Sequence, residues 1–238
     1  MKCLKVLLFT TLIGLVVSCN KDKEEVEMDL GYEYINTEIG SYVVYQVDST
    51  IYNDFDASIR KVTVQFKEKI VEKFADNLGR PAYRVERYTR DSSEQTWHLA
   101  RTYYFVKQER AYEKVEENLR FVSFVFPPKQ DATWNGNRYI EAVDNNNYLA
   151  DWSYKYTAVN VPATINGIGY PLTSTVLLRD RETVIEKVFA KEIFAKGVGM
   201  VYKEWWKLET QNNFEKPWEE KAERGYIVKM QAISHGVE

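Results

Sequence analysis

The sequence predicts an all-β protein, a single antiparallel meander that forms a strongly curved sheet, half-barrel or sandwich with at most short helices. Three observations support this fold class. From residue 42 onward, apolar side chains recur at every second position, which is the period of a strand with one buried face. These runs are rich in Tyr, Val, Phe, Thr and Trp, which favour strands. Stretches with a helical period are short and few.

The segment 59–74 is the clearest expected strand. Its apolar side chains, among them Phe66, share one face, and lysines occupy the other. Glu68 and Glu72 interrupt the apolar face. Asn and Gly in the turn that follows tolerate positive φ, so the chain returns as a hairpin. By the same alternation we expect strands at 41–52, 59–74, 82–90, 97–107, 110–115, 119–126, 138–143, 152–162, 171–178, 184–194, 198–210 and 225–233.

The best helical candidate is the short segment Pro217–Gly225, which has a proline near its start and a glycine at its end. No segment repeats at a fixed period, and no Gly/Ser-rich linker divides the chain. Residues 31–238 are therefore expected to form a single β domain.

Residues 1–18 have the features of an export signal. Lys2 and Lys5 precede an uncharged, mostly apolar stretch at 6–17, which is shorter than the roughly 20 residues that a membrane-spanning helix needs. The sequence that ends in Ser18-Cys19 resembles a bacterial lipobox. The resemblance implies cleavage after Ser18 and attachment of diacylglycerol and a further acyl chain, such as palmitate, to Cys19. Two or more acyl chains give stable membrane anchoring.

Residues 19–30 are expected to form a lipidated, flexible tether, because the charged run after Cys19 has no apolar period. This run also resembles the acidic export signal of Bacteroidota-type lipoproteins, which directs them to the outer face of the outer membrane. The resemblance implies a lipid-anchored outer-membrane protein. Lys23 interrupts the acidic run and leaves surface exposure open.

Composition excludes several classes of protein. Apolar residues make up 45% and aromatic residues 14% of the chain, which is too much for a disordered protein. Removing Lys2 and Lys5 with the leader takes the formal net charge from −3 to −5, so no nucleic-acid partner is expected. The chain has two Cys, two His and no Gly-x-Ser-x-Gly motif. We therefore expect no catalytic centre, no metal site and no cofactor.

The most distinctive internal stretch is AKGVGMVYKE at 195–204. Its two glycines, Gly197 and Gly199, suit a bulge or tight bend between two strands. The stretch resembles one near the C-terminus of uncharacterised Bacteroidota lipoproteins. More loosely, it resembles curved antiparallel sheets such as the periplasmic lipoprotein-carrier fold, a half-barrel with a helical lid. This resemblance supports a curved sheet and an envelope location.

Aromatic side chains are the candidate ligand or partner surface. Alternation along the strand places Tyr202 and Trp206 on one face and Trp205 on the other. Trp134 and Trp152 lie near Asn and Asp residues, a combination that suits stacking on a sugar; the alternative is that they cap the end of the β core. Both interpretations remain open from the sequence.

Three function classes follow from these observations. The first is a non-enzymatic, lipid-anchored envelope protein whose curved β domain binds a hydrophobic or glycan ligand or a partner protein. The second is a structural or assembly component of the outer membrane that docks another protein through strand edges and aromatic patches. An anchored hydrolase, the third, needs a catalytic constellation that the sequence does not contain.

Overall fold

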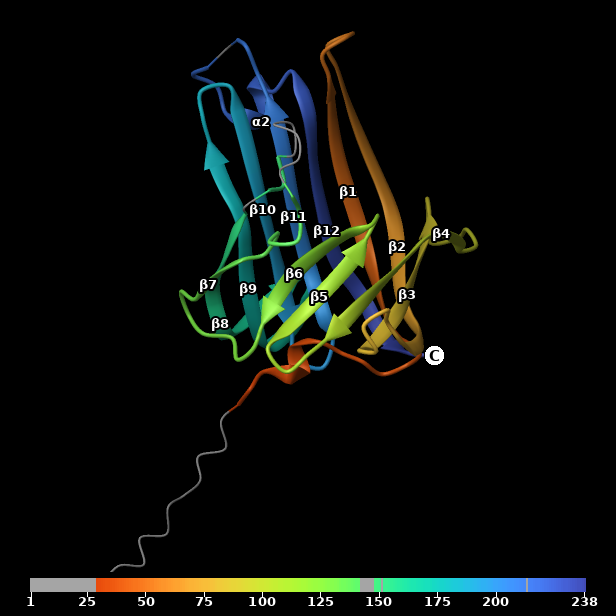
Figure 1. The fold of residues 1–238 in the computed structure, drawn as a ribbon. Coiled ribbons are helices and arrows are strands. Elements are labelled where there is room, and N and C mark those ends of the chain that lie inside the picture. The colour runs from red at the N-terminus through yellow and green to blue at the C-terminus, as the bar shows by residue number, and fades with distance from the viewer. Residues whose placement is uncertain (1–28, 142–147, 151, 213) are drawn as a thin grey trace, which may run out of the picture.

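The computed structural model describes residues 29–141, 148–150, 152–212 and 214–238 (Figure 1). They form one sheet of twelve antiparallel strands in the order β6-β5-β4-β3-β2-β1-β12-β11-β10-β9-β8-β7. This confirms the predicted all-β meander. The strands are β1 (Ser41–Asn53), β2 (Ser58–Ala75), β3 (Pro81–Arg90), β4 (His98–Lys107), β5 (Ala111–Glu116), β6 (Leu119–Val125), β7 (Thr133–Asn135), β8 (Ser153–Ile165), β9 (Ile168–Glu182), β10 (Glu186–Ala195), β11 (Gly199–Glu209) and β12 (Arg224–Val237).

Pairing of β1 with β12 joins the two halves of the meander. The first six strands therefore extend from β1 in one direction, and the last six extend from β12 in the other. The two edge strands, β6 and β7, are consecutive along the chain and meet across a seam. There the Val122 amide donates to the carbonyl oxygen of Gly136 at 2.7 Å. The sheet is thus a nearly closed barrel, which decides among the shapes that the sequence left open.

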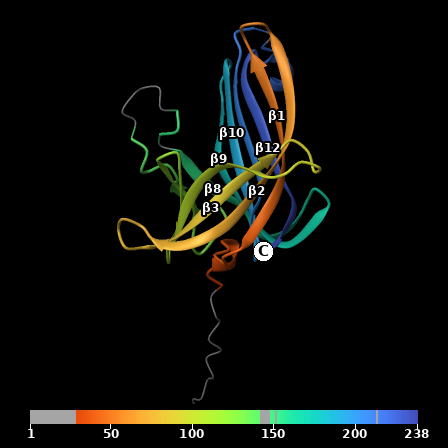
Figure 2. The ribbon, with the colours of Figure 1, turned by 90° about the vertical axis from the view of Figure 1, so that its right-hand side faces the viewer.

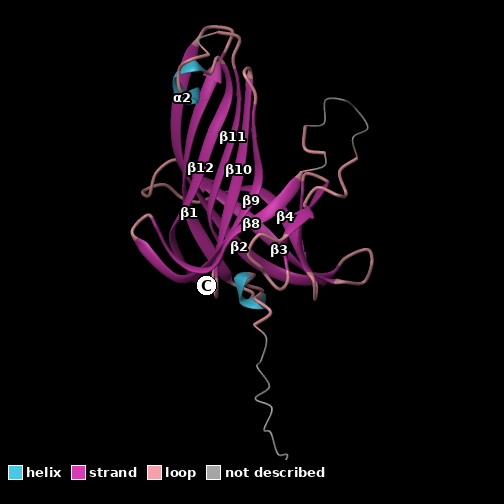
Figure 3. Cartoon of the chain, turned by 90° about the vertical axis from the view of Figure 1, so that its left-hand side faces the viewer, coloured by secondary structure: helices cyan, strands magenta, loops and turns pink. Residues whose placement is uncertain are grey.

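The barrel has a tall wall and a lower front. Strands β1, β2 and β9–β12 form the wall, and β3–β6 cross in front of its lower part (Figure 1). Seen from the side, the β1–β2 hairpin rises to the upper end and β2 curves along the base (Figure 2). The short helix α2 (Trp218–Lys221) lies at the upper end, and the N-terminal segment and the C-terminus lie at the lower end (Figure 3). Within the described residues no helix is long and apolar enough to cross a membrane.

Aromatic side chains dominate the core. Phe124 lies at its centre, with its ring centroid 5.1 Å from those of Tyr156 and Phe194. A second cluster forms where the β8–β9 hairpin packs against β1, β11 and β12. A third joins Trp218 of α2 to Leu208 of β11 at the upper end. Burial of these large apolar surfaces supplies the main stabilisation of the sheet.

Most expected elements correspond to observed ones. The expected strands match β1–β6 and β8–β12 with shifted ends, and α2 lies inside the expected helix. The strand expected at 138–143 is wrong: the described part of that range is turn and loop, and the strand present is Thr133–Asn135. The reason is that side-chain contacts hold this segment as a loop. Asn137 accepts a hydrogen bond from the Tyr154 hydroxyl at 2.7 Å, and the Ile140 side chain is buried. The last two residues of the range lie outside the described residues.

Candidate ligand-binding cavity

A cavity lies inside the barrel between β4–β6 and β9–β11. Its volume is about 220 Å³. One part of its lining is charged and another is apolar. The charged lining residues are Arg101, Lys114, Glu116, Glu117, Glu192 and Lys203. The apolar lining residues are Leu119, Phe121, Leu149, Leu178 and Trp205.

Strand geometry brings the charged residues together. Lys114 and Glu116 are two positions apart on β5 and therefore share a face, where Nζ lies 2.8 Å from Oε2. Glu192 stands directly opposite Lys203 in the β10–β11 register, with 2.9 Å between carboxylate and ammonium. Both side chains of that pair are mostly buried, so the interaction is weakly screened by solvent.

The mouth of the cavity is marked by its most exposed charged lining residues. Arg101 of β4 forms an ion pair with Glu117, which lies in the β5–β6 turn. Their side chains are 45% and 64% exposed. A surface pair of this kind contributes at most about 1 kcal/mol to stability. Its importance lies in the charge of the lining: with this pair, each of the three cations that line the cavity has a carboxylate partner.

A second layer of charge lies behind the lining. Arg87 of β3 contacts Glu68 at 2.6 Å and Glu116 at 2.8 Å. The Tyr103 hydroxyl donates to Glu68 at 2.9 Å. Burial opposes ionisation of Glu116, but attraction to Lys114 and Arg87 outweighs it and lowers the pKa of its carboxyl to about 2. Burial likewise opposes ionisation of Glu68, and Arg87 keeps the pKa of that carboxyl below its usual value. Both carboxylates are therefore charged at neutral pH.

Trp205 forms part of the apolar wall. Its ring stacks on Trp152 with centroids 5.2 Å apart, and the Lys203 ammonium lies 5.2 Å from its centroid. The Trp205 Nε1 is buried and has no hydrogen-bond partner in the described part of the chain. An unpaired buried donor costs about 1–3 kcal/mol, so this indole is placed at some cost to stability.

The two faces of β11 differ as the alternation predicts. On the face opposite Trp205, the Tyr202 hydroxyl and the Trp206 Nε1 each donate to Glu204 at 2.9 Å. Glu204 also pairs with Lys191 at 3.2 Å. Tyr202 and Trp206 therefore have partners within the sheet, whereas Trp205 faces the cavity. Any binding role of Tyr202 and Trp206 stays a prediction.

The other two tryptophans contribute to the core and the seam. The Trp134 Nε1 donates to the Val122 carbonyl at 2.7 Å, which ties β7 to β6. Trp152 is 1% exposed and donates to the Tyr148 carbonyl at 2.6 Å. These contacts favour the interpretation that both cap the β core over the interpretation that they form an exposed sugar-stacking surface. Ser18 and Cys19, the predicted cleavage and lipid-attachment residues, lie outside the described residues.

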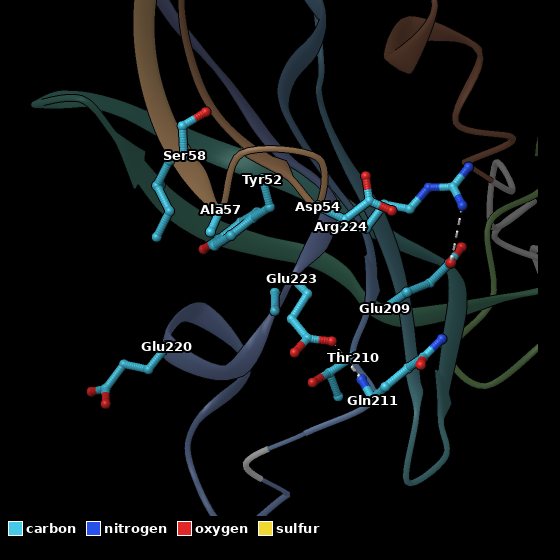
Figure 4. Close-up of a pocket in the computed structure, with 12 residues that line it drawn as sticks. Tyr52, Asp54, Ala57, Ser58, Glu209, Thr210, Gln211, Glu220, Glu223 and Arg224 are labelled. Atoms are coloured by element: carbon cyan, nitrogen blue, oxygen red, sulfur yellow. Dashed lines mark hydrogen bonds and ion pairs between the residues drawn. The ribbon is translucent and has the colours of Figure 1, made fainter.

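A larger hollow of about 540 Å³ lies at the upper end, between the β1–β2 hairpin and the segment 209–224 (Figure 4). Carboxylates dominate it, and two of them already have partners. Glu209 lies 4.0 Å from Arg224, and Glu223 accepts from the Gln211 amide at 2.8 Å. These are surface side chains around loop ends. The described residues hold no group of three or more His, Cys, Asp or Glu arranged to bind a metal ion.

Sequence reasoning named Trp205 but not the charges beside it. Glu68 was visible as an interruption of an apolar face, and its partner Arg87 has the parity of Val85, which is buried. Glu192 likewise lies two positions before the buried Phe194 and therefore on the same face of β10. A charged residue at a position where the alternation of the strand calls for an apolar one is thus the sequence signal for an interior charge. Which strands face one another across the barrel could not be known from alternation.

The chain matches no family model and no curated protein. A solved structure from Bacteroides fragilis, described as a "putative exported protein with YmcC-like fold", matches with a TM-score of 0.40 and 8% identity. The match covers 84% of this chain and 98% of that chain. At this TM-score the likeness carries no argument about function or location.

Proposed function

We propose that this chain is a non-enzymatic, lipid-anchored protein of the cell envelope whose β domain binds a small ligand inside the barrel. The observation that carries the proposal is the cavity of about 220 Å³ with a charged and an apolar lining. The lipobox ending in Ser18-Cys19 and the charged tether support an outer-membrane location.

The charged lining supports binding over a purely structural role. Ion pairs removed from water rarely stabilise a fold more than well-packed apolar residues of the same size would. The barrel nevertheless places Lys203 and Glu192 beside an open volume that apolar side chains could have filled. Groups that face an open cavity remain available to a ligand, which explains their position better than packing does.

The test is to fill the cavity. Ser123 of β6 lines it and is 5% exposed, so Ser123→Leu places a larger side chain in the same space. We expect native mass spectrometry of the wild-type protein, extracted from membranes in mild detergent, to show a small-molecule adduct that Ser123→Leu lacks. Ser234→Leu, on an exposed position of β12, is the matched control and should keep the adduct. A wild-type protein without any adduct would count against the proposal.

A second candidate function, docking of another protein, is favoured by the upper end of the wall. Three turns there expose large apolar side chains: Phe55 is 94%, Val184 64% and Phe214 48% exposed. Exposed apolar residues gathered at one end are typical of interaction sites. Replacing Phe55 and Val184 with Ser should then abolish cross-linking to an envelope protein in intact cells. Leu78→Ser, in the β2–β3 turn, is the control, and equal cross-linking in all variants would exclude this site.

A further inference from the structure

We propose that the ligand of the interior cavity is a neutral, hydroxyl-rich ring, that is, one saccharide unit. This inference rests on the proposed function and names the chemical class of its ligand. Three properties of the lining point to it: the balance of its charges, the combination of a charged wall with an apolar wall, and its volume.

The charge balance disfavours a charged ligand. Lys203 already contacts Glu192 at 2.9 Å, and Lys114 contacts Glu116 at 2.8 Å. An anion that paired with Lys203 would bring a second negative charge beside Glu192, whose side chain is only 7% exposed, so the repulsion between the two anions would be weakly screened by solvent. A hydroxyl group can accept from the ammonium and donate to the carboxylate at the same time, so it binds without breaking the pair.

The two walls disfavour a hydrocarbon ligand. A lipid chain in this cavity would take water from six charged side chains without giving them hydrogen bonds, at a large cost in free energy. A sugar ring carries hydroxyl groups at its rim and C–H groups on its faces. The C–H groups fit against Phe121, Leu178 and Trp205, and the hydroxyls fit against the ion pairs.

The volume of the cavity agrees with this class. About 220 Å³ is below the roughly 300–1,000 Å³ of pockets that take drug-sized ligands, so one ring fits better than an extended chain. Charge-assisted hydrogen bonds donated by the Lys203 ammonium and accepted by the Glu192 carboxylate would add strength and orientation.

The first experiment compares defined probes on the delipidated wild-type protein. A panel of neutral hexoses and N-acetylhexosamines is titrated while tryptophan emission is recorded. Glucose 6-phosphate and glucosamine are the anionic and cationic comparisons, and laurate, an anion with a long hydrocarbon chain, is the fatty-acid comparison. We expect at least one neutral sugar to bind saturably, and about tenfold or more tightly than each comparison, because a charged probe adds an unbalanced charge to the lining and a hydrocarbon chain gives the lining charges no hydrogen bonds.

The second experiment uses neighbouring tryptophans as a matched pair. Trp205→Phe removes the indole that faces the cavity, and Trp206→Phe makes the same change on the opposite face of β11. Sugar affinity, read by calorimetry, should fall about tenfold in Trp205→Phe and stay unchanged in Trp206→Phe. The double variant Glu192→Gln/Lys203→Gln keeps the cavity neutral and near its size but removes the charge-assisted hydrogen bonds. It should also bind sugar more weakly, which keeps the test decisive if Trp205→Phe does not fold.

The outcomes separate the ligand class from the proposed function. Suppose that the wild-type protein carries an adduct that Ser123→Leu lacks. The saccharide assignment alone is then overturned if no neutral sugar binds, or if laurate or glucose 6-phosphate binds more tightly than the sugars. Absence of the adduct, with no probe binding at all, overturns both. Equal loss of sugar affinity in Trp205→Phe and Trp206→Phe also contradicts the assignment, because Trp206 does not line the cavity.

Discussion

Neighbouring cations inside the barrel hold the carboxyl of Glu116 in its ionised state by lowering its pKa. Glu116 is the centre of this arrangement, because Lys114 and Arg87 both contact its carboxylate. Each charge would be costly if it were alone in the interior, and each is tolerated because its neighbours compensate for the lost water. The stability of the barrel should therefore depend on the ionisation of this one carboxyl.

Stability is expected to fall with pH through Glu116. Its pKa is about 2 in the folded protein and near 4.5 without the fold, so between these values the unfolded chain binds more protons than the folded one. The contribution of Glu116 is complete above about pH 4.5 and is lost as the pH falls towards 2. It amounts to about 3 kcal/mol at most. Urea unfolding of wild type and Glu116→Gln over this range measures it.

The neighbouring residue provides the control for that measurement. Glu117 is 64% exposed and pairs at the surface with Arg101, so Glu117→Gln should keep the pH dependence of the wild type. Glu116→Gln should show a shallower decrease of the unfolding free energy below pH 4.5. Identical pH profiles for wild type and Glu116→Gln would show that Glu116 is not stabilised as the contacts indicate.

Among the elements, β6 and β8 show how the barrel closes without a continuous row of backbone hydrogen bonds between its edge strands. The Tyr156 hydroxyl donates to the Val125 carbonyl at 2.6 Å and accepts from the Val125 amide at 3.0 Å. The Trp134 indole satisfies the Val122 carbonyl in the same way. Side chains of β7 and β8 therefore take the place of backbone pairing along an edge strand that would otherwise be open.

Loss of one hydroxyl should loosen this seam. Tyr156→Phe leaves both polar groups of Val125 without their partner at a cost of about 1–3 kcal/mol. We expect faster amide hydrogen exchange in β6, with the rest of the sheet unchanged. Tyr202→Phe, which removes a hydroxyl from the opposite face of β11, should leave exchange in β6 as in the wild type. Unchanged exchange in Tyr156→Phe would mean that backbone contacts alone close the seam.

The start of β12 depends on a glycine. Gly225 has a φ of +116°, and a Cβ there would lie 1.9 Å from the Lys207 carbonyl oxygen on β11. Gly225→Ala should therefore displace one of the two strands and lower the melting temperature strongly, as differential scanning calorimetry would show. Gly79 also has positive φ, but its Cβ would meet open space. Gly79→Ala should cost only about 1 kcal/mol, and an equal loss in both variants would contradict the steric argument.

At the scale of the whole molecule, local alternation predicted the strands but not their closure. A period of two says which side chains share a face, and it correctly separated Trp205 from Trp206. It does not say that β1 pairs with β12, because that contact joins residues nearly two hundred positions apart. The charges of Glu192 and Glu116 meet near the cavity only because of that closure, so the sequence showed the aromatic part of the candidate site and missed its ionic part.

The N-terminal segment connects this barrel to its expected location. The described chain begins at the lower end, where Asp29 pairs with Lys196 (Figure 1). The lipid anchor is predicted at Cys19, ten residues earlier, and the intervening run is charged and without apolar period. Anchoring and ligand binding should therefore be separable: the tether sets where the barrel is held, and the barrel folds and binds without it.

Cysteine substitutions test this separation directly. Cys19→Ala should abolish metabolic labelling with a palmitate analogue, because it removes the side chain that is predicted to be acylated. Cys3→Ala is the matched control and should label as the wild type does, because Cys3 lies in the predicted leader. The melting temperature and sugar affinity of the detergent-free Cys19→Ala protein should equal those of the delipidated wild type. Labelling of Cys19→Ala would place the anchor elsewhere, and a loss of stability would show that the lipidated segment packs on the barrel.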